Sequence, residues 1–378
     1  MKKAQKRIAL VARDAAPSGA FQRLASELQA RGKDPVTFLG NGAPIGVAPT
    51  EIVNHLSECD FVLFGMSSSA DLAREELTVA EAANDLNLPF GFYKDIVEGS
   101  SIRAHFNHDW LKSGASLLFV RNEEEAVYMR DMLPNATVVA SGNPLVEDAF
   151  FPRLDRRGVR NAFGIGQDER VIFCTGTKLA FENFYCFVAV LNAVDQLGKA
   201  YSQDRFRVIF SMHPGDPNLK YVYDSDNILV RGEYNDEELM QSGVYRDLFN
   251  YSSVPAMLVT KQRMSSTDIL PGVDLVINTG STIAESAACL RLPVIDFLGG
   301  QLALNRYARL GLPDYPFANS RAGVSLWAHA ESLYPLICEF ANSLGDSRRL
   351  RSRQEEIYPR PQERGQAIRI MADALQAI

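Results

Sequence analysis

The chain has 378 residues, which exceeds the size at which a single hydrophobic core usually stops growing, so two domains are expected. Its 46% hydrophobic and 22% charged residues are typical of an ordinary soluble globular protein. The net charge of −7 disfavours nucleic acid as a partner, and no apolar run is long enough to span a membrane. Five scattered cysteines without a CxxC pair favour free thiols in a reducing compartment, so a cytoplasmic protein is expected.

The first half alternates short β-rich runs with amphipathic helical segments, which predicts a parallel α/β architecture. Helices are expected at Ala20–Arg31, which Gly32 ends, and at Val79–Leu88. The expected strands are Arg7–Ala12, Asp34–Leu39, Phe61–Gly65, Pro89–Tyr93, Ser116–Val120 and Thr137–Ser141.

Two connections in the first half carry candidates for catalysis. The turn Arg13–Gly19 follows the first strand and brings Asp14 close to a helix N-terminus. The loop Lys94–Trp110 is dense in titratable groups, among them Asp95 and His105, so it is the expected place for a general base, with Asp95 preferred. His105 and the histidine three residues later lack further ligands at zinc spacing, so no metal is expected.

The second half restarts the same pattern. Its expected strands are Arg170–Thr175, Phe206–Met212, Asn227–Val230, Pro255–Thr260, Asp274–Asn278 and Val294–Phe297, with a long helix at Phe181–Leu197. The basic, proline-bearing stretch Phe151–Arg160 predicts a linker, which divides the chain into a first domain 1–152, a linker 153–160 and a second domain 161–358. The arginine-rich run 348–353 is expected to be a solvated, hinge-like stretch before a final helix within 359–378.

The loop after the first strand of the second domain contains Gly176, Thr177 and Lys178. It offers a flexible backbone, a hydroxyl and a cation, which suit a diphosphate, although a plain turn with an exposed lysine has the same residues. His213 ends the next strand and could donate a hydrogen bond to a phosphate or a base, or serve a structural role. Ligands of open parallel sheets bind beyond the carboxyl ends of strands, where both loops are expected.

The stretch Val273–Phe297 reads strand, tight turn, helix, turn, strand. Gly280, Ser281 and Thr282 open its helix, where free N–H groups, two hydroxyls and the positive end of the helix dipole favour a phosphate. Glu285 follows one helical turn later, at a place suited to accept hydrogen bonds from a sugar diol. Thr282-x-x-Glu285 is also a capping box, so the sequence leaves both interpretations open.

Together these loops resemble the GT-B group, in particular lipid-A-disaccharide synthases and UDP-N-acetylglucosamine 2-epimerases. The likeness is carried by Ala15–Gly19, by the Ser-Gly-Asn-Pro-Leu-Val segment at 141–146, by Phe163–Ile165 with Val171–Lys178, and by Asn278–Glu285 with Pro293-Val294.

The resemblance implies two Rossmann-like domains facing across a cleft, with the final helix crossing back onto the first domain. It implies that Thr177, Lys178, Ser281 and Thr282 face the diphosphate of a nucleotide sugar and that Glu285 holds the ribose. His213 is similar to the His-Pro element of GT-B polymerases that use CMP- or CDP-linked donors, so the base is uridine or cytidine. The expected activity is glycosyl transfer to an acceptor hydroxyl in surface glycan or glycoconjugate biosynthesis.

Two alternatives stay open. A nucleotide-sugar 2-epimerase of the same fold needs no acceptor, but its His-Arg-Arg-Glu-Asn-type element is replaced here by Lys178–Asn183. A non-catalytic nucleotide-binding partner is the other, because Ala20 stands where the synthases have an aspartate. No cofactor is expected besides the nucleotide-sugar donor, the expected partners are the donor and the acceptor, and a homodimer is left open.

Overall fold

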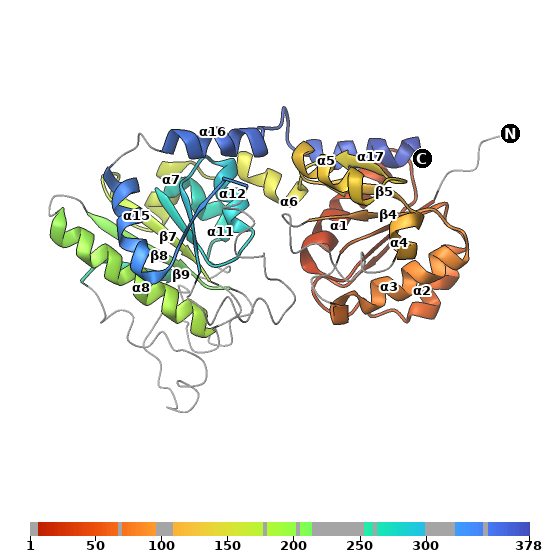
Figure 1. The fold of residues 1–378 in the computed structure, drawn as a ribbon, viewed down its shortest axis with the longest axis horizontal. Helices are drawn as coiled ribbons and strands as arrows, with labels where there is room; N and C mark the ends of the chain where they lie inside the picture. Colours follow the sequence, from red (N-terminus) through yellow and green to blue (C-terminus); the bar gives the residue numbers. More distant parts are fainter. Residues whose placement is uncertain are drawn as a thin grey trace, which may run out of the picture. The chain divides into compact units, whose positions relative to one another are not determined.

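The computed structural model describes residues 7–66, 70–95, 109–176, 180–201, 205–213, 253–259, 263–298, 322–342 and 347–378. The chain divides into two compact units (Figure 1): unit 1 comprises Met1–Glu147 with Pro361–Ile378, and unit 2 comprises Asp148–Arg360. Each unit contains one six-stranded sheet in which all neighbouring strands are parallel. The predicted α/β class with two Rossmann-like sheets is therefore confirmed.

The sheet of unit 1 has the strand order β2-β1-β3-β4-β5-β6. Its strands are β1 (Ile8–Ala12), β2 (Val36–Leu39), β3 (Phe61–Phe64), β4 (Phe90–Tyr93), β5 (Ala115–Val120) and β6 (Thr137–Ala140). Its helices are α1 (Ala15–Ala30), α2 (Pro49–Leu56), α3 (Ala70–Asp85), α4 (Asp109–Gly114), α5 (Glu123–Met132), α6 (Pro144–Glu147) and α17 (Gln366–Ala377). Strands β1, β3 and β4 are buried along their whole length, because helices cover both faces of the sheet.

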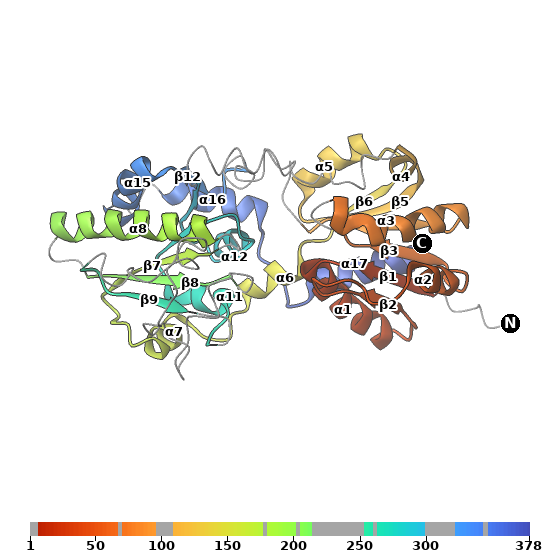
Figure 2. The same ribbon diagram turned by 90° about the horizontal axis from the view of Figure 1, so that it is seen from below.

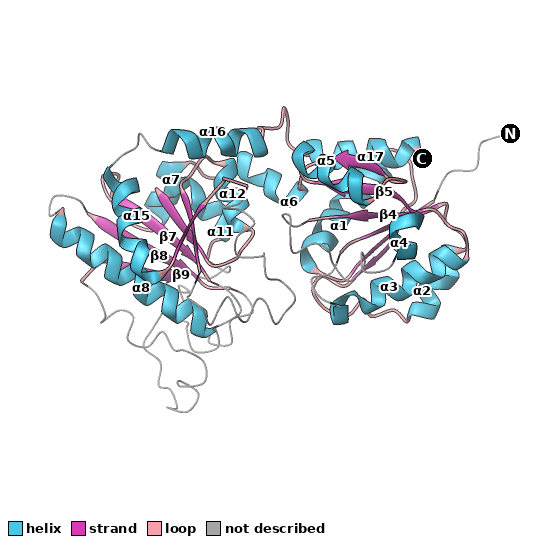
Figure 3. Ribbon diagram, viewed as in Figure 1, coloured by secondary structure: helices cyan, strands magenta, loops and turns pink. Residues whose placement is uncertain are grey.

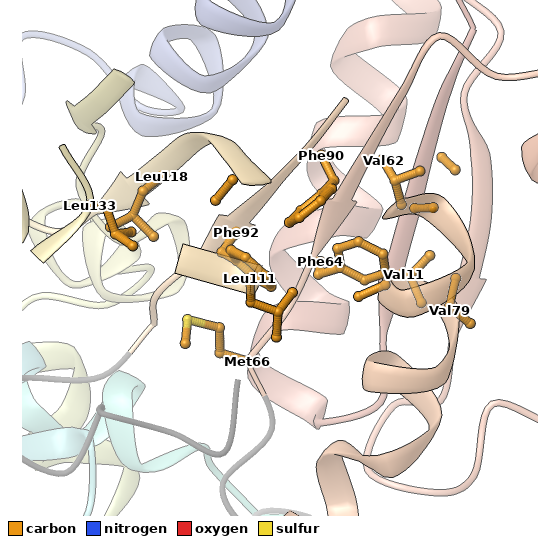
Figure 4. Packing of buried hydrophobic residues seen from close by; sticks show 14 of the residues in the cluster. Val11, Val62, Phe64, Met66, Val79, Phe90, Phe92, Leu111, Leu118 and Leu133 are labelled. Carbon is orange, nitrogen blue, oxygen red and sulfur yellow. The ribbon is translucent and has the colours of Figure 1, made fainter. Parts of the chain in front are cut away.

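One face of the unit 1 sheet packs against α2, α3, α4 and α5. Figure 4 shows part of this core, with Phe64, Phe90 and Phe92 close to Val79 and Leu111. Phe64, Phe90 and Phe92 form the centre of this core, and the rings of Phe90 and Phe92 meet edge to face with centroids 5.8 Å apart. Leu111 from α4 and Val79 from α3 pack against them. Aromatic rings in this geometry add to the stabilisation that burial of their area provides.

The other face is covered by α1 and by the C-terminal helix α17, which lie side by side (Figure 2). Ile368, Met371 and Leu375 recur at helical spacing and pack into the same core as Phe21 and Leu24 of α1. The last helix of the chain is therefore part of the first structural unit, although unit 2 separates the two in sequence.

The sheet of unit 2 has the strand order β12-β11-β10-β7-β8-β9. Figure 3 shows strands of this sheet in magenta, among them β7, β8 and β9, with helices in cyan around them. Its strands are β7 (Arg170–Thr175), β8 (Phe206–Ser211), β9 (Ala256–Val259), β10 (Leu275–Asn278), β11 (Val294–Phe297) and β12 (Leu326–Ala328). Helices α8 (Ala180–Ala200) and α15 (Ala330–Asn342) cover one face. The other face is covered by α7 (Arg156–Ala162), α11 (Ser266–Ile269), the 3-10 turn η4 (Leu270–Gly272) and α12 (Ile283–Cys289). Among the described residues of this unit, the remaining elements are the 3-10 turn η2 (Asp148–Phe150) and α16 (Ser347–Ile357).

The predicted linker 153–160 is wrong for most of its length, because Arg156–Ala162 forms helix α7. Asp155 caps this helix by accepting a hydrogen bond from Gly158 N at 2.7 Å, and Val159 is fully buried in the core of unit 2. Arg160 is also fully buried. The stretch therefore belongs to the second unit instead of connecting the two.

Other expectations differ in detail. The run 348–353 is not a hinge but part of α16, whose buried Leu350, Gln354 and Ile357 share one face while Arg348 and Arg349 are exposed. The turn expected at Arg13–Gly19 is mostly helical, since α1 begins at Ala15. The strand expected at Asn227–Val230 lies outside the described residues. Within the described ranges, no helix combines the length and the apolar content that crossing a bilayer requires.

Candidate functional site

Three adjacent strands of unit 2 end in the loops that the sequence singles out. Gly176 follows β7, His213 follows β8, and the turn that contains Gly280 follows β10. Because β10, β7 and β8 are neighbours in a parallel sheet, these loops lie at one edge, where open α/β sheets bind ligands. The described candidates Gly176, His213, Gly280, Ser281, Thr282 and Glu285 thus share one edge of the sheet. Thr177 and Lys178 lie outside the described residues.

Gly176 lies where two strand ends approach closely. Its N–H donates to Ser211 O at 2.8 Å, and a Cβ on Gly176 would lie only 2.9 Å from that oxygen and 3.3 Å from His213 N. Asn183, a fully buried residue of α8, has its Oδ1 3.4 Å from the same point. Only glycine therefore fits here, which brings the backbones after β7 and β8 together.

The turn Thr279–Thr282 is held by hydrogen bonds that its residues donate to strand residues. Thr279 N donates to Thr175 Oγ1 at 3.1 Å, Thr279 Oγ1 donates to Thr175 O at 2.7 Å, and Ser281 N donates to Asn278 Oδ1 at 3.1 Å. Gly280 has a φ of +86°, a conformation that favours glycine. The turn therefore has one defined shape before any ligand binds.

The capping-box interpretation of Thr282 is wrong. Thr282 is exposed and its side chain makes no capping hydrogen bond. Instead, Ser281 Oγ accepts from Ile283 N at 3.3 Å, at the start of α12. Glu285 lies in the first turn of α12 and is 2% exposed. The hydroxyl of Thr282 is consequently available at this edge, whereas the Glu285 carboxylate lies below the surface.

A row of buried polar side chains that was not expected from the sequence lies beneath this turn. Thr175 Oγ1 donates to Asn278 Oδ1 at 3.0 Å, and Asn278 Nδ2 donates to Asp296 Oδ1 at 2.7 Å. Ser325 Oγ donates to the second carboxylate oxygen, Asp296 Oδ2, at 2.5 Å. All four residues are at most 4% exposed. The signal that could have revealed the row is a polar residue inside each of the apolar runs LVIN and VIDF.

Burial raises the pKa of the Asp296 carboxyl from its ordinary value of 3.8 to about 6, although hydrogen bonds from Ser325 and Asn278 oppose the shift. The folded protein therefore holds this proton at pH values where the unfolded chain has lost it. We expect Asp296 to reduce the free energy of unfolding by about 2 to 3 kcal/mol as pH rises from about 4 to about 6. Urea unfolding of the wild type and of Asp296→Asn across this range isolates the effect. A stability difference that does not change with pH would contradict it.

In unit 1, the candidates Asp14 and Asp95 follow β1 and β4 at the carboxyl edge of the sheet. Asp14 occupies the N-cap position of α1 without a side-chain capping hydrogen bond. Asp95 is 7% exposed, and its backbone carbonyl accepts from Asn143 Nδ2 at 3.2 Å. β3 separates β1 from β4 in the sheet, so the two residues follow strands that are not direct neighbours. His105 lies outside the described residues.

The same edge of unit 1 contains a buried ionic cluster that the sequence analysis did not identify. Glu125 contacts Lys94 Nζ, accepts from Arg121 N at 3.1 Å and lies 3.5 Å from Arg121 Nε. The three side chains are at most 4% exposed. Lys94 follows β4 and Arg121 follows β5, so the cluster lies beside Asp95. No group of three His, Cys, Asp or Glu side chains suited to a metal occurs within the described ranges.

Solved structures match nearly the whole length of the chain, whereas sequence comparisons find no relative. Sequence comparison finds no matching family model and no matching curated protein. A UDP-GlcNAc 2-epimerase from Neisseria meningitidis, solved bound to UDP-GlcNAc, matches 98% of this chain and 100% of its own at a TM-score of 0.63 and 13% identity. MurG from Acinetobacter baumannii matches over 99% and 100% at a TM-score of 0.57 and 11% identity. The chain has the GT-B fold.

A third GT-B structure, MnaA from S. aureus solved with UDP, matches 99% of this chain and 98% of its own at a TM-score of 0.60 and 14% identity. The N. meningitidis structure is of a UDP-GlcNAc 2-epimerase with its UDP-sugar bound, and the S. aureus structure contains UDP. At such low identity the likeness shows the fold that the chain shares with them, and the chemistry must be argued from its own residues.

Proposed function

We propose that this GT-B chain is an enzyme that binds a nucleotide diphosphate sugar at the carboxyl edge of the unit 2 sheet. The observation that carries the proposal is the meeting of three strand ends at Gly176, His213 and the turn Thr279–Thr282. Structures of the same fold from N. meningitidis and S. aureus were solved with UDP-GlcNAc and UDP, which supports this class of ligand.

Each candidate residue at the carboxyl edge of the unit 2 sheet contacts a particular part of the nucleotide sugar. Gly176 and Gly280 let the backbone approach the diphosphate, and Thr177, Lys178, Ser281 and Thr282 donate to its oxygens. His213 donates a hydrogen bond to a phosphate or to the base, which is uracil or cytosine. Glu285 accepts hydrogen bonds from the ribose hydroxyls.

We further propose glycosyl transfer as the reaction, in the synthesis of a surface glycan or glycoconjugate. The bond between the anomeric carbon and the leaving phosphate breaks, and the acceptor oxygen bonds to that carbon. Hydrogen-bond donors at the unit 2 edge stabilise the departing diphosphate. Asp95 takes the acceptor proton, with Asp14 and His105 as the other candidates for this role.

A second candidate function is nucleotide-sugar 2-epimerisation, which the UDP-GlcNAc 2-epimerases among the similar structures favour. An epimerase removes and returns the proton at the sugar C2 and needs no acceptor. Incubating the protein with UDP-GlcNAc alone separates the two: a changed sugar still attached to UDP indicates epimerisation, whereas sugar transfer only after an acceptor is added indicates a transferase. Binding without either change indicates a non-catalytic nucleotide-binding partner.

A thermal-shift screen with UDP, CMP, CDP, GDP and dTDP tests the nucleotide site. We expect UDP or a cytidine nucleotide to stabilise the protein by about 2.7 kcal/mol when its concentration is 100 times Kd. Glu285→Ala should abolish this shift, because the ribose loses its acceptor. Glu356→Ala, which removes a largely exposed carboxylate from α16, is the control and should leave the shift unchanged. A full shift in Glu285→Ala would contradict the ribose-binding role.

A further inference from the structure

Three neighbouring strands of unit 2 and the residue before a fourth contribute to the buried polar row Thr175–Asn278–Asp296–Ser325. Asn278 and Asp296 are paired across β10 and β11, and Thr175 ends the next strand, β7. Ser325 immediately precedes β12 on the other side. The row therefore crosses the sheet directly beneath the turn that follows β10.

The hydrogen bond between Asn278 and Asp296 takes its direction from the carboxylate. An ionised carboxylate can only accept, so Asn278 must present its Nδ2 to Asp296. The amide oxygen of Asn278 then points the other way, where it accepts from Thr175 Oγ1 and from Ser281 N. Since Thr175 donates its hydroxyl proton to Asn278, its oxygen is left to accept from Thr279 N.

We propose that Asp296 is a positioning residue that sets the conformation of the turn Thr279–Ser281 by fixing the orientation of the Asn278 amide. An amide can rotate to exchange its oxygen and nitrogen, and the two ends differ in hydrogen-bonding role. Reversal of Asn278 would put an NH₂ group against Ser281 N–H and replace an attraction with a repulsion. The role of the turn in nucleotide binding rests on the function proposed above, whereas its dependence on Asp296 does not.

The cost of burying a carboxylate supports this role. A buried charge stabilises a fold poorly compared with an apolar side chain of similar volume, so stability alone does not explain an aspartate within the apolar strand β11. An asparagine at this position would have nearly the same shape but could either donate or accept. An ionised carboxylate can only accept, and this fixes the Asn278 amide in the orientation that lets its oxygen accept from Ser281 N.

Amide hydrogen exchange of the protein without ligand, measured by NMR at pH 8, tests the proposal. Asp296→Asn should speed exchange at Thr279 and Ser281 about tenfold, as expected when one buried hydrogen bond is lost. Ser325→Ala is the matched control, because it removes the hydroxyl from Asp296 Oδ2 but leaves the contact with Asn278 intact; exchange in the turn should then match the wild type. Unchanged exchange in Asp296→Asn, or faster exchange throughout the unit 2 sheet, would overturn the proposal.

Exchanging the side chains of Asp296 and Asn278 should restore the conformation of the turn. Asn278→Asp alone places two carboxylates against each other and should disturb the turn more than Asp296→Asn does. The double variant Asp296→Asn/Asn278→Asp restores a donor facing an acceptor and leaves an acceptor oxygen for Ser281 N–H. Its exchange at Ser281 should return to within about twofold of the wild type, even if a single variant fails to fold. Failure of the double variant to recover would overturn the proposal.

The affinity for a nucleotide tests whether the turn that Asp296 positions takes part in nucleotide binding. If UDP or CDP binds the wild type, calorimetric titration should show about tenfold weaker binding to Asp296→Asn and recovery in the double variant. If neither nucleotide binds the wild type, the proposed function fails, while the exchange measurements still decide the role of Asp296. Equal affinity in wild type and Asp296→Asn would contradict the positioning role in binding.

Discussion

Replacing Arg160 with methionine should lower the free energy of unfolding of unit 2 by about 3 to 5 kcal/mol. The fully buried guanidinium donates to Gly272 O at 3.0 Å, Gly166 O at 2.7 Å, Glu169 O at 2.8 Å and Asp274 Oδ2 at 2.8 Å. Methionine has a similar length but no donor, so several buried carbonyls and one carboxylate oxygen would lose a partner. Urea unfolding monitored by far-UV circular dichroism measures the effect.

Arg156→Ala is the matched control for this prediction. Arg156 also pairs with Asp274, at 2.6 Å from Oδ1, but its side chain is 45% exposed. Exposed ion pairs contribute little, so we expect a loss below about 1 kcal/mol. Similar losses in the two variants would show that burial of Arg160 is not what makes its contacts matter.

Glu147→Ala should destabilise unit 1 by about 2 to 4 kcal/mol, and its main consequence should be release of α17. The Glu147 carboxylate is 8% exposed and accepts from the backbone N–H groups of Gly365, Gln366 at 3.0 Å and Ala367 at 2.8 Å. These groups are the first donors of α17, which have no partner within the helix itself. Limited proteolysis should cut α17 much faster in the variant, because its apolar face no longer stays in the core.

Glu363→Ala provides the comparison for the α17 prediction. Glu363 pairs with Arg369 but is 69% exposed, so its loss should change stability by less than about 0.5 kcal/mol and leave proteolysis unaffected. Resistance of the C-terminal helix in Glu147→Ala would mean that the apolar face Ile368–Leu375 holds α17 without the cap.

The described strands other than β12 could be predicted from the sequence, because most of them are buried on both faces and read as short apolar runs. The three-residue β12 is only partly buried and does not form such a run. Helix α1 begins at Ala15, five residues before the expected start at Ala20. Pro17 and Ser18 suggest a turn, but proline is tolerated in the first turn of a helix. Ser18 is fully buried and donates to Ala12 O at 3.2 Å, a tertiary contact that no local pattern reveals.

The predicted linker 153–160 shows that a charged residue is not always exposed to solvent, as a basic stretch of sequence suggests. Arg160 reads as a solvated residue in a basic stretch, yet its partners lie up to 114 residues away, at Asp274. In the same way, Asn278 and Asp296 are 18 residues apart and meet only because β10 and β11 pair in register. The alternation of strands and helices along the sequence predicts which loops follow strand ends. Polar contacts between strands depend on the order of the strands in the sheet, and the sequence of a single strand does not reveal that order.

A crystal structure of the protein with UDP or CDP tests the proposed nucleotide site most directly. We expect the diphosphate within hydrogen-bonding distance of the turn Thr279–Thr282 and of the loop that begins at Gly176, with the ribose hydroxyls directed at Glu285. A nucleotide bound at the opposite, amino-terminal edge of the unit 2 sheet, or on unit 1 alone, would contradict the proposed site.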